Sequence, residues 1–353
     1  MMKTSAPVRI LTGDALAMLK RLEHDSFDGC FCDPPYGLSS TEKRNMRRQS
    51  PRASSRATAT GFMGMAWDAQ VPGVELWAEV LRVLKPGAPI LVFGGARTFH
   101  RLVCAIEDAG FLVADTICWV HGQGFPKGKA QLKPAWEPIT LAWKKGKRAP
   151  LAIEASRIDL KGGYKCRANG RPSQTGLGDN YNPLAANKPD DKGRWPANVI
   201  LDPESAALLD EQSGHLVSGG NPSKRSADKH RTVYAGWKGE QCLVHRGTDA
   251  GGAARFFYCA KASKKERGEG NTHPTVKPLK LCEYLARLIL PPGKNAKLLV
   301  PFSGSGSEII GARRAGWKHI TGIEAEAEYV AMTRARLKQT VHAATARILT
   351  MTA

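Results

Sequence analysis

Short apolar runs alternate with amphipathic segments in the first 144 residues and again after residue 271. Apolar runs bounded by glycine, proline or polar residues predict strands, and apolar residues three or four positions apart predict helices. The predicted strands cover residues 8–11, 27–32, 89–93, 111–120, 135–143, 297–302 and 319–323. The predicted helices cover residues 15–22, 75–84, 97–109, 279–290, 308–315 and 325–339. Because strands and helices alternate, we predict an α/β fold with a doubly wound sheet.

The segment between these two parts has a different character. It is rich in Gly, Asn, Pro, Lys and Arg, and its few periodic apolar segments include 195–201 and 254–260. A stretch of this length is not a simple loop. We therefore predict a discontinuous domain formed by residues 1–144 and 271–353, into which a module of residues 145–270 is inserted.

The charge of the chain indicates a polyanionic partner. Lys and Arg outnumber Asp and Glu by 52 to 32, which gives a formal net charge of +20. The chain has no lipidation signal, no signal-peptide core and no apolar run near the ~20 residues that a membrane span needs. We therefore expect a cytoplasmic protein that binds nucleic acid and not a membrane.

Two basic clusters are predicted to neutralise backbone phosphates. The first lies in the polar stretch 39–60 and the second lies in the inserted module. Together they comprise Arg44, Arg47, Arg48, Arg52, Lys224, Arg225 and Arg231. A solvated loop explains the stretch 39–60 equally well, whereas aromatic residues among the charges of the module favour a folded nucleic-acid surface.

A stiff turn with a carboxylate and an aromatic ring follows the predicted strand 27–32. Its sequence is Asp33-Pro34-Pro35-Tyr36. The prolines have a fixed φ and no N–H group, so the carbonyl groups of the turn face outward as acceptors. Such a turn suits a planar exocyclic amine, and Tyr36 offers a flat face for a base. An ordinary strand-to-loop turn is the alternative interpretation.

A second candidate site follows the predicted strand 297–302. Gly304-Ser305-Gly306 precedes a predicted helix, and glycines there let backbone amides approach a ligand. Ile309 stands where a dinucleotide fingerprint has its third glycine, so a pyrophosphate cofactor is disfavoured. Glu324, at the end of the next strand, is placed to accept from ribose hydroxyls. Asp14 also follows a strand and is either a ligand contact or a helix N-cap.

The ordered motifs resemble those of DNA amino-methyltransferases of the beta arrangement. The motifs are Asp33 to Tyr36, then Thr275-Val276-Lys277-Pro278, then Pro301 to Gly306. Further stretches at 61–68, 122–127, 194–202 and 254–263 resemble phage and prophage members. The resemblance covers essentially the whole chain. It implies a circularly permuted Rossmann-like sheet that uses S-adenosyl-L-methionine without a metal, and an irregular target-recognition module at 145–270 that binds double-stranded DNA.

The resemblance also implies which residues form the site. The catalytic residues would be Asp33, Pro34, Pro35 and Tyr36. The cofactor-binding residues would be Asp14, Thr275, Lys277, Phe302, Ser303, Gly304, Ser305, Gly306 and Glu324. Val300 stands where the family usually has Asp. The group that holds the methionine amine is therefore left open between Asp33 and a backbone carbonyl.

These observations predict site-specific methylation of the N6 amine of adenine in a flipped-out base. Methylation of the N4 amine of cytosine is the alternative, but cytosine enzymes of this arrangement more often have Ser where this chain has Asp33. A DNA-binding module without activity is a third interpretation. Carbon-5 methylation of cytosine is disfavoured because the chain contains no Pro-Cys pair. Homodimer formation and a cognate restriction nuclease both stay open.

Overall fold

The computed structural model describes residues 8–37, 70–122, 124, 129, 132–159, 166–167, 189–190, 193–218, 249–260, 276–293 and 295–351. The chain forms two compact units. The larger unit contains Met1–Ser156, Asn198–Ser205 and Cys259–Ala353, and the smaller unit contains Arg157–Ala197 and Ala206–Tyr258. These boundaries differ from the predicted ones mainly because parts of the predicted insertion belong to the larger unit.

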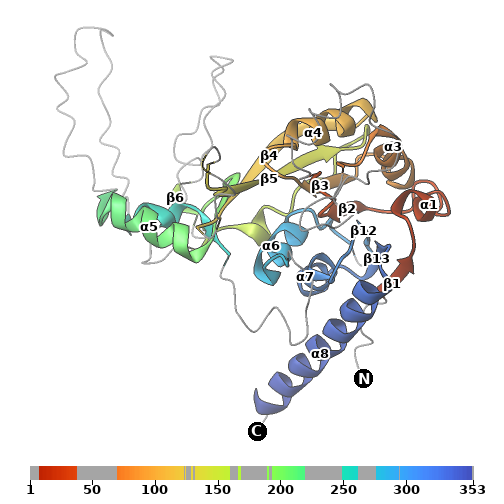
Figure 1. The fold of residues 1–353 in the computed structure, drawn as a ribbon. Helices are drawn as coiled ribbons and strands as arrows, with labels where there is room; N and C mark the ends of the chain where they lie inside the picture. The colour runs from red at the N-terminus through yellow and green to blue at the C-terminus, as the bar shows by residue number, and fades with distance from the viewer. Residues whose placement is uncertain are drawn as a thin grey trace, which may run out of the picture. The chain divides into compact units, whose positions relative to one another are not determined.

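Among the described residues, nine strands form the large sheet (Figure 1). Their spatial order is β1 (Val8–Thr12), β13 (His319–Glu324), β12 (Lys297–Pro301), β2 (Gly29–Cys32), β3 (Pro89–Phe93), β5 (Trp136–Trp143), β4 (Leu112–Val120), β8 (Val199–Leu201) and β11 (Tyr258–Cys259). The first five run parallel, and β5 runs antiparallel between β3 and β4. Strands from both ends of the chain thus alternate at one side of the sheet. The expected permuted, doubly wound α/β fold is confirmed.

Helices cover both faces of this sheet in the larger unit (Figure 1). One face carries α1 (Ala15–Leu19), α3 (Val74–Val83) and α4 (Phe99–Asp108), and the other carries α6 (Leu279–Leu288) and α7 (Ser307–Ala315). The chain ends in the long helix α8 (Ala327–Met351). Central parallel strands covered on both faces are apolar throughout, and every residue of β2 and β3 is buried.

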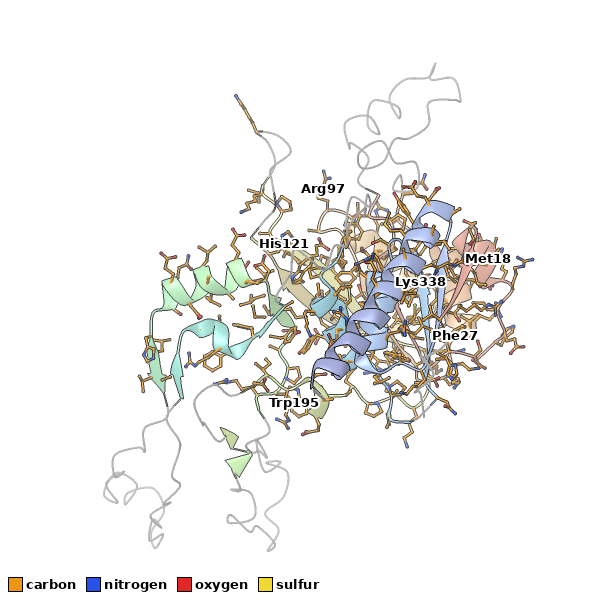
Figure 2. All side chains as sticks on the ribbon, turned by 90° about the horizontal axis from the view of Figure 1, so that it is seen from below. Met18, Phe27, Arg97, His121, Trp195 and Lys338 are labelled. Carbon is orange, nitrogen blue, oxygen red and sulfur yellow. The ribbon has the colours of Figure 1, made fainter. Side chains whose placement is uncertain are left out.

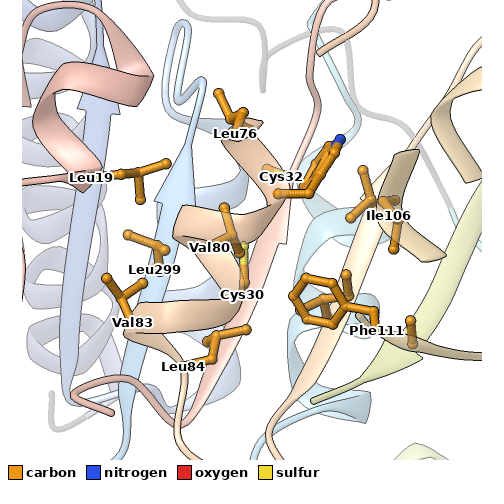
Figure 3. Close-up of a cluster of buried hydrophobic side chains, with 14 of the residues drawn as sticks. Leu19, Cys30, Cys32, Leu76, Val80, Val83, Leu84, Ile106, Phe111 and Leu299 are labelled. Carbon is orange, nitrogen blue, oxygen red and sulfur yellow. The ribbon is translucent and has the colours of Figure 1, made fainter. Parts of the chain in front are cut away.

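The core beneath α1, α3 and α4 is built from alternate strand residues and from one stripe of each helix. Figure 3 shows Val80 and Val83 of α3 near Cys30 of β2 and Leu299 of β12. Each fully buried aliphatic side chain stabilises the fold by roughly 1.5–3 kcal/mol. This core therefore fixes β2 and β12, whose carboxyl ends carry Asp33 and the glycine turn.

The apolar run 195–201 is the clearest departure from the sequence-based interpretation. It was expected in the inserted module, but its second half forms β8, which pairs parallel with β4 in the large sheet. Asp202 then accepts hydrogen bonds from the N–H groups of Gly122 (3.0 Å) and Ser205 (2.7 Å). These bonds fix the start of α5 (Pro203–Ser213).

The smaller unit contains short paired strands. β9 (Leu216–Ser218) pairs antiparallel with β10 (Asp249–Gly251), and β6 (Cys166–Arg167) pairs antiparallel with β7 (Pro189–Asp190). The Trp195 side chain is 64% exposed, and the Arg157 guanidinium lies 5.5 Å from its ring centroid (Figure 2). None of the helices in the described part of the chain has both the length and the apolar character needed to cross a membrane.

The packing of α6 on α7 leaves no room for a side chain at Gly311. A Cβ there would lie 2.5 Å from Cys282 Cβ and 2.6 Å from its carbonyl carbon. In Gly311→Ala, overpacking should cost about 1–3 kcal/mol, more than the helix-propensity gain of about 1 kcal/mol. We expect a lower thermal unfolding midpoint. Gly73→Ala is the control: nothing lies within 4 Å of the added Cβ, so its midpoint should fall only through the weaker N-cap of α3. An unchanged midpoint for Gly311→Ala would contradict the packing.

Candidate active site

The Asp33–Tyr36 turn leaves the sheet at the carboxyl end of β2, where parallel strands of α/β sheets place their ligand sites. The turn is held by the loop between β3 and α4. The Thr98 hydroxyl donates to the Tyr36 carbonyl oxygen (2.6 Å), and a Cβ at Gly95 would lie 3.0 Å from the Tyr36 ring. The turn therefore has a defined conformation before any ligand binds.

The Lys277 ammonium group lies between two carboxylates in this site. Its Nζ is 3.0 Å from Asp33 Oδ2 and 2.9 Å from Glu137 Oε2, and the side chain is 6% exposed. The same Nζ donates to the Tyr36 hydroxyl (2.9 Å). That hydroxyl donates to Asp33 Oδ1 (2.7 Å) or to Glu137 Oε2 (3.0 Å). Asp33, Tyr36, Glu137 and Lys277 thus form one connected group, which we call the catalytic cluster.

Burial and charge set the protonation states of the catalytic cluster. Burial alone lowers the pKa of Lys277, but the Asp33 and Glu137 carboxylates outweigh burial and hold this pKa above its usual value. Burial raises the pKa of Asp33, an effect that the charge of Lys277 opposes. Burial and both carboxylates raise the pKa of Tyr36 well above its usual value. Lys277 is therefore charged and Tyr36 is a neutral donor at physiological pH.

Glu137 is a member of the catalytic cluster that the sequence interpretation missed. It lies on β5, where it reads as one polar residue at the start of an apolar strand, and it is 101 residues from Tyr36. Its other oxygen, Oε1, lies 4.0 Å from His121 Nε2. Lys277 was expected near the methionine end of a cofactor, and the structure places its ammonium group against Asp33.

The second candidate site is the glycine turn after β12. Gly304 and Gly306 have φ values of 48° and 83°, and Phe302 has a φ of 58°, which a bulky residue rarely adopts. Such backbone strain is concentrated at functional sites. The Gly304 N–H donates to Glu324 Oε2 (2.6 Å), and the Glu326 N–H donates to Glu324 Oε1 (3.0 Å). The Glu324 carboxylate is thereby oriented at the end of β13.

Helix α8 supports the glycine turn through hydrogen bonds from two of its side chains. The Thr333 hydroxyl donates to the Gly304 carbonyl oxygen (2.9 Å), and Arg336 Nη1 donates to the carbonyl oxygen (2.6 Å) and the hydroxyl (3.0 Å) of Ser305. A Cβ at Gly306 would lie 2.5 Å from Thr333 Cγ2. Gly306 is therefore required for contact with α8. Thr333 and Arg336 are supporting residues that no sequence motif indicated.

Of the other predicted residues, Asp14 lies in the described part of the chain and several do not. Asp14 caps α1, because its Oδ1 accepts from the Ala17 N–H (2.9 Å), and Thr12, two residues earlier, pairs with Glu324 in the sheet. The predicted residues that lie outside the described part of the chain are Thr275, Arg44, Arg47, Arg48, Arg52, Lys224, Arg225 and Arg231. Within the described residues, no group of three or more His, Cys, Asp or Glu side chains is arranged to hold a metal ion.

The chain is similar to several known proteins. The Type II methyltransferase M2.LlaDCHI of Lactococcus lactis subsp. cremoris is 25% identical over 340 residues, which cover 94% of this chain and 89% of that protein. The PvuII DNA methyltransferase, described as cytosine-N4-specific, has a TM-score of 0.49 at 15% identity and covers 94% of this chain and 87% of its own. The M1.HpyAVI-SAM complex has a TM-score of 0.45 at 15% identity, with coverages of 94% and 100%.

A protein-family model described as DNA methylase, of the N6/N4 class, matches residues 27–335. This match spans most of the chain and includes both candidate sites. The chain therefore belongs to the family of N6/N4 DNA methylases.

Proposed function

We propose that this protein transfers a methyl group from S-adenosyl-L-methionine to the N6 amine of adenine in a base flipped out of duplex DNA. The observation that carries the proposal is the Asp33 carboxylate, held at the carboxyl end of β2 in the same sheet as the glycine turn after β12. One site then offers acceptors for an amine, and the other offers a turn for a nucleoside.

The residues of the glycine turn fit S-adenosyl-L-methionine. Glu324 presents an oriented carboxylate that can also accept from ribose hydroxyls. Ser303 Oγ is buried without a hydrogen-bond partner among the described residues, which suits a site that a polar ligand completes. Phe302 lies beside them in its strained conformation. The chemistry that the cofactor supplies when bound is an electrophilic methyl group on a sulfonium.

The Asp33 carboxylate and the Pro34 carbonyl are the acceptors for the two hydrogens of the target amine. The lone pair of an aromatic amine is delocalised into the ring and is a poor nucleophile. Acceptors that hold both hydrogens favour a pyramidal nitrogen, whose lone pair is then available for an in-line attack. Positive charge develops on this nitrogen, so the preoriented Asp33 carboxylate stabilises the transition state more than the ground state.

The amine of the base must compete with donors from which Asp33 already accepts hydrogen bonds. Lys277 and the Tyr36 hydroxyl both donate to Asp33 in the present structure, and both also lie within hydrogen-bond distance of Glu137. We infer that Glu137 retains these two donors when the base binds. Glu137 thus acts as a positioning residue that keeps Lys277 from competing with the substrate for Asp33.

Recognition of DNA is assigned to the rest of the chain. Flipping a base costs a few kcal/mol, and stacking on Tyr36, worth about 1–3 kcal/mol, offsets part of this cost. The smaller unit is the candidate target-recognition module, and the two predicted basic clusters are candidates for phosphate contacts. The carboxylate of Asp33 is the feature that favours adenine over cytosine.

Methyl transfer to DNA tests the proposed function directly. The protein is incubated with S-adenosyl-L-methionine and unmethylated plasmid or genomic DNA, and the DNA is digested to nucleosides for mass spectrometry. We expect N6-methyldeoxyadenosine, because Asp33 occupies the acceptor position. N4-methyldeoxycytidine would show that the target base is cytosine, and the absence of any methylated nucleoside would contradict the proposal.

Replacement of Asp33 tests the acceptor role. In Asp33→Ala the amine loses a charged acceptor, and we expect kcat to fall at least about 100-fold, as for loss of one preoriented group at other sites. The affinity for S-adenosyl-L-methionine, measured by calorimetry, should change by less than about threefold. Asp108→Ala, an exposed change at the end of α4, is the control. Near-normal turnover by Asp33→Ala would rule out this role.

Replacement of Glu137 tests the positioning role. An amide in Glu137→Gln cannot hold the Lys277 charge, so Lys277 should bind Asp33 more tightly and kcat should fall about 10-fold or more, equivalent to about 1.4 kcal/mol. Cofactor affinity should stay unchanged. The control is Glu75→Gln, because Glu75 also lies 2.9 Å from a lysine, Lys20, but is 69% exposed. A normal kcat, or a change confined to cofactor affinity, would exclude the role.

A further inference from the structure

A buried carboxylate that the proposed mechanism does not use lies at the start of α7. Glu308 is 4% exposed and belongs to the first turn of the helix that follows the glycine turn. Among the described residues it forms no ion pair, and its carboxylate accepts only from the Cys282 thiol (Sγ to Oε1, 4.0 Å) and from its own backbone N–H. A buried acidic group is normally paired with a cation or well hydrogen-bonded. Glu308 therefore requires an explanation.

The cations near Glu308 are held by other groups. Lys277 binds Asp33 and Glu137, and Arg336 donates to Ser305 and Ser307. Burial, followed by the charge of Asp33, raises the pKa of Glu308 to about 7. The charges of Lys277 and Arg336 lower this pKa, but less than burial and Asp33 raise it, and Glu308 forms no ion pair with either residue in the described part of the chain. The Glu308 carboxylate could therefore take a cationic ligand as its partner.

The position of Glu308 indicates which part of a ligand it would meet. It lies two residues after Gly306, at the N-terminus of the helix that the glycine turn begins, and its pKa responds to both Asp33 and Lys277. Its place on α7 puts it beside the glycine turn, where the nucleoside is proposed to bind, and the charges of the catalytic cluster act on it. Val300, at the end of β12, is buried and apolar and supplies no acid there.

We propose that the Glu308 carboxylate binds the α-ammonium group of the methionine part of S-adenosyl-L-methionine. An ammonium is a compact cation with three donors, and it would both neutralise the buried carboxylate and satisfy its acceptors. This proposal rests on the cofactor assigned under the proposed function. Glu308 would then be a cofactor-binding residue, and Asp33 would stay available for the amine of the base.

Calorimetry with two thioether analogues of the cofactor, which differ in the amino-acid part, tests this assignment. S-adenosyl-L-homocysteine carries the ammonium but no sulfonium charge, and 5′-methylthioadenosine lacks the amino-acid part. In Glu308→Gln, loss of a buried charge-assisted hydrogen bond, about 1.5–3 kcal/mol, should weaken S-adenosyl-L-homocysteine about 10- to 100-fold. Binding of 5′-methylthioadenosine should change less than about threefold. Glu107→Gln, an exposed change on α4, is the control.

Each other outcome overturns the proposal in a distinct way. Unchanged binding of S-adenosyl-L-homocysteine by Glu308→Gln would remove the ammonium contact. Weakening of S-adenosyl-L-methionine alone would assign the carboxylate to the sulfonium. Weakening of both S-adenosyl-L-homocysteine and 5′-methylthioadenosine would show that Glu308 supports the whole pocket. Failure of the unsubstituted protein to bind any of these ligands would instead contradict the proposed function.

The pH dependence of stability provides a second readout. The pKa of Glu308 in the folded protein, about 7, lies above its usual 4.5, so the stability that this group contributes is full below about pH 4.5 and is lost as the pH rises through about 7. The titratable and charged groups around it are Asp33, Cys32, Lys277, Cys282 and Arg336.

Without ligand, Glu308→Gln should unfold at a higher temperature than the unsubstituted protein at pH 8, and at a similar temperature at pH 5. Saturating S-adenosyl-L-homocysteine should reduce the difference at pH 8. A difference at pH 8 that the ligand leaves unchanged would overturn the proposal.

Discussion

The ammonium group of Lys277, buried between two carboxylates, is the interaction on which the candidate active site depends. It connects the turn after β2, the strand β5 and the segment before α6 through Asp33, Glu137 and the Tyr36 hydroxyl. Two buried carboxylates that bind the same ammonium group would repel each other without that cation. Lys277 therefore opposes the rise in the pKa of Asp33 that burial causes, and an ionised Asp33 is the acceptor that the proposed transfer requires.

The glycine turn depends on a different constraint, which is the close approach of backbone to its neighbours. Gly304 and Gly306 adopt positive φ values, and α8 contacts the turn through Thr333 and Arg336. The Glu324 carboxylate holds the Gly304 N–H from the adjacent strand. A turn held from two sides loses little further freedom when a ligand binds, which favours affinity.

The sheet places these two sites next to each other by pairing strands from distant parts of the chain. β2 and β12 are neighbours in the sheet although more than 260 residues separate Asp28 from Lys297, whose backbone N–H donates to the Asp28 carboxylate. The element types followed from periodicity, because long apolar runs and helical spacing are local signals. The residues of β8 were expected in the inserted module, because a short apolar run does not show which sheet it joins. They pair with β4 in the large sheet.

The sequence by itself determined the order of motifs, the alternation of strands and helices, and the identity of the Asp33–Tyr36 turn and the glycine turn. These are local properties, because the required glycine, proline and acidic residues lie within a few positions of one another. Only the tertiary structure decided that Glu137 joins Lys277, that Arg336 supports Ser305, and that Glu308 is buried without an ion pair among the described residues. Each of these depends on which side chains meet across the fold and on how far water is excluded, and neither is encoded in local spacing.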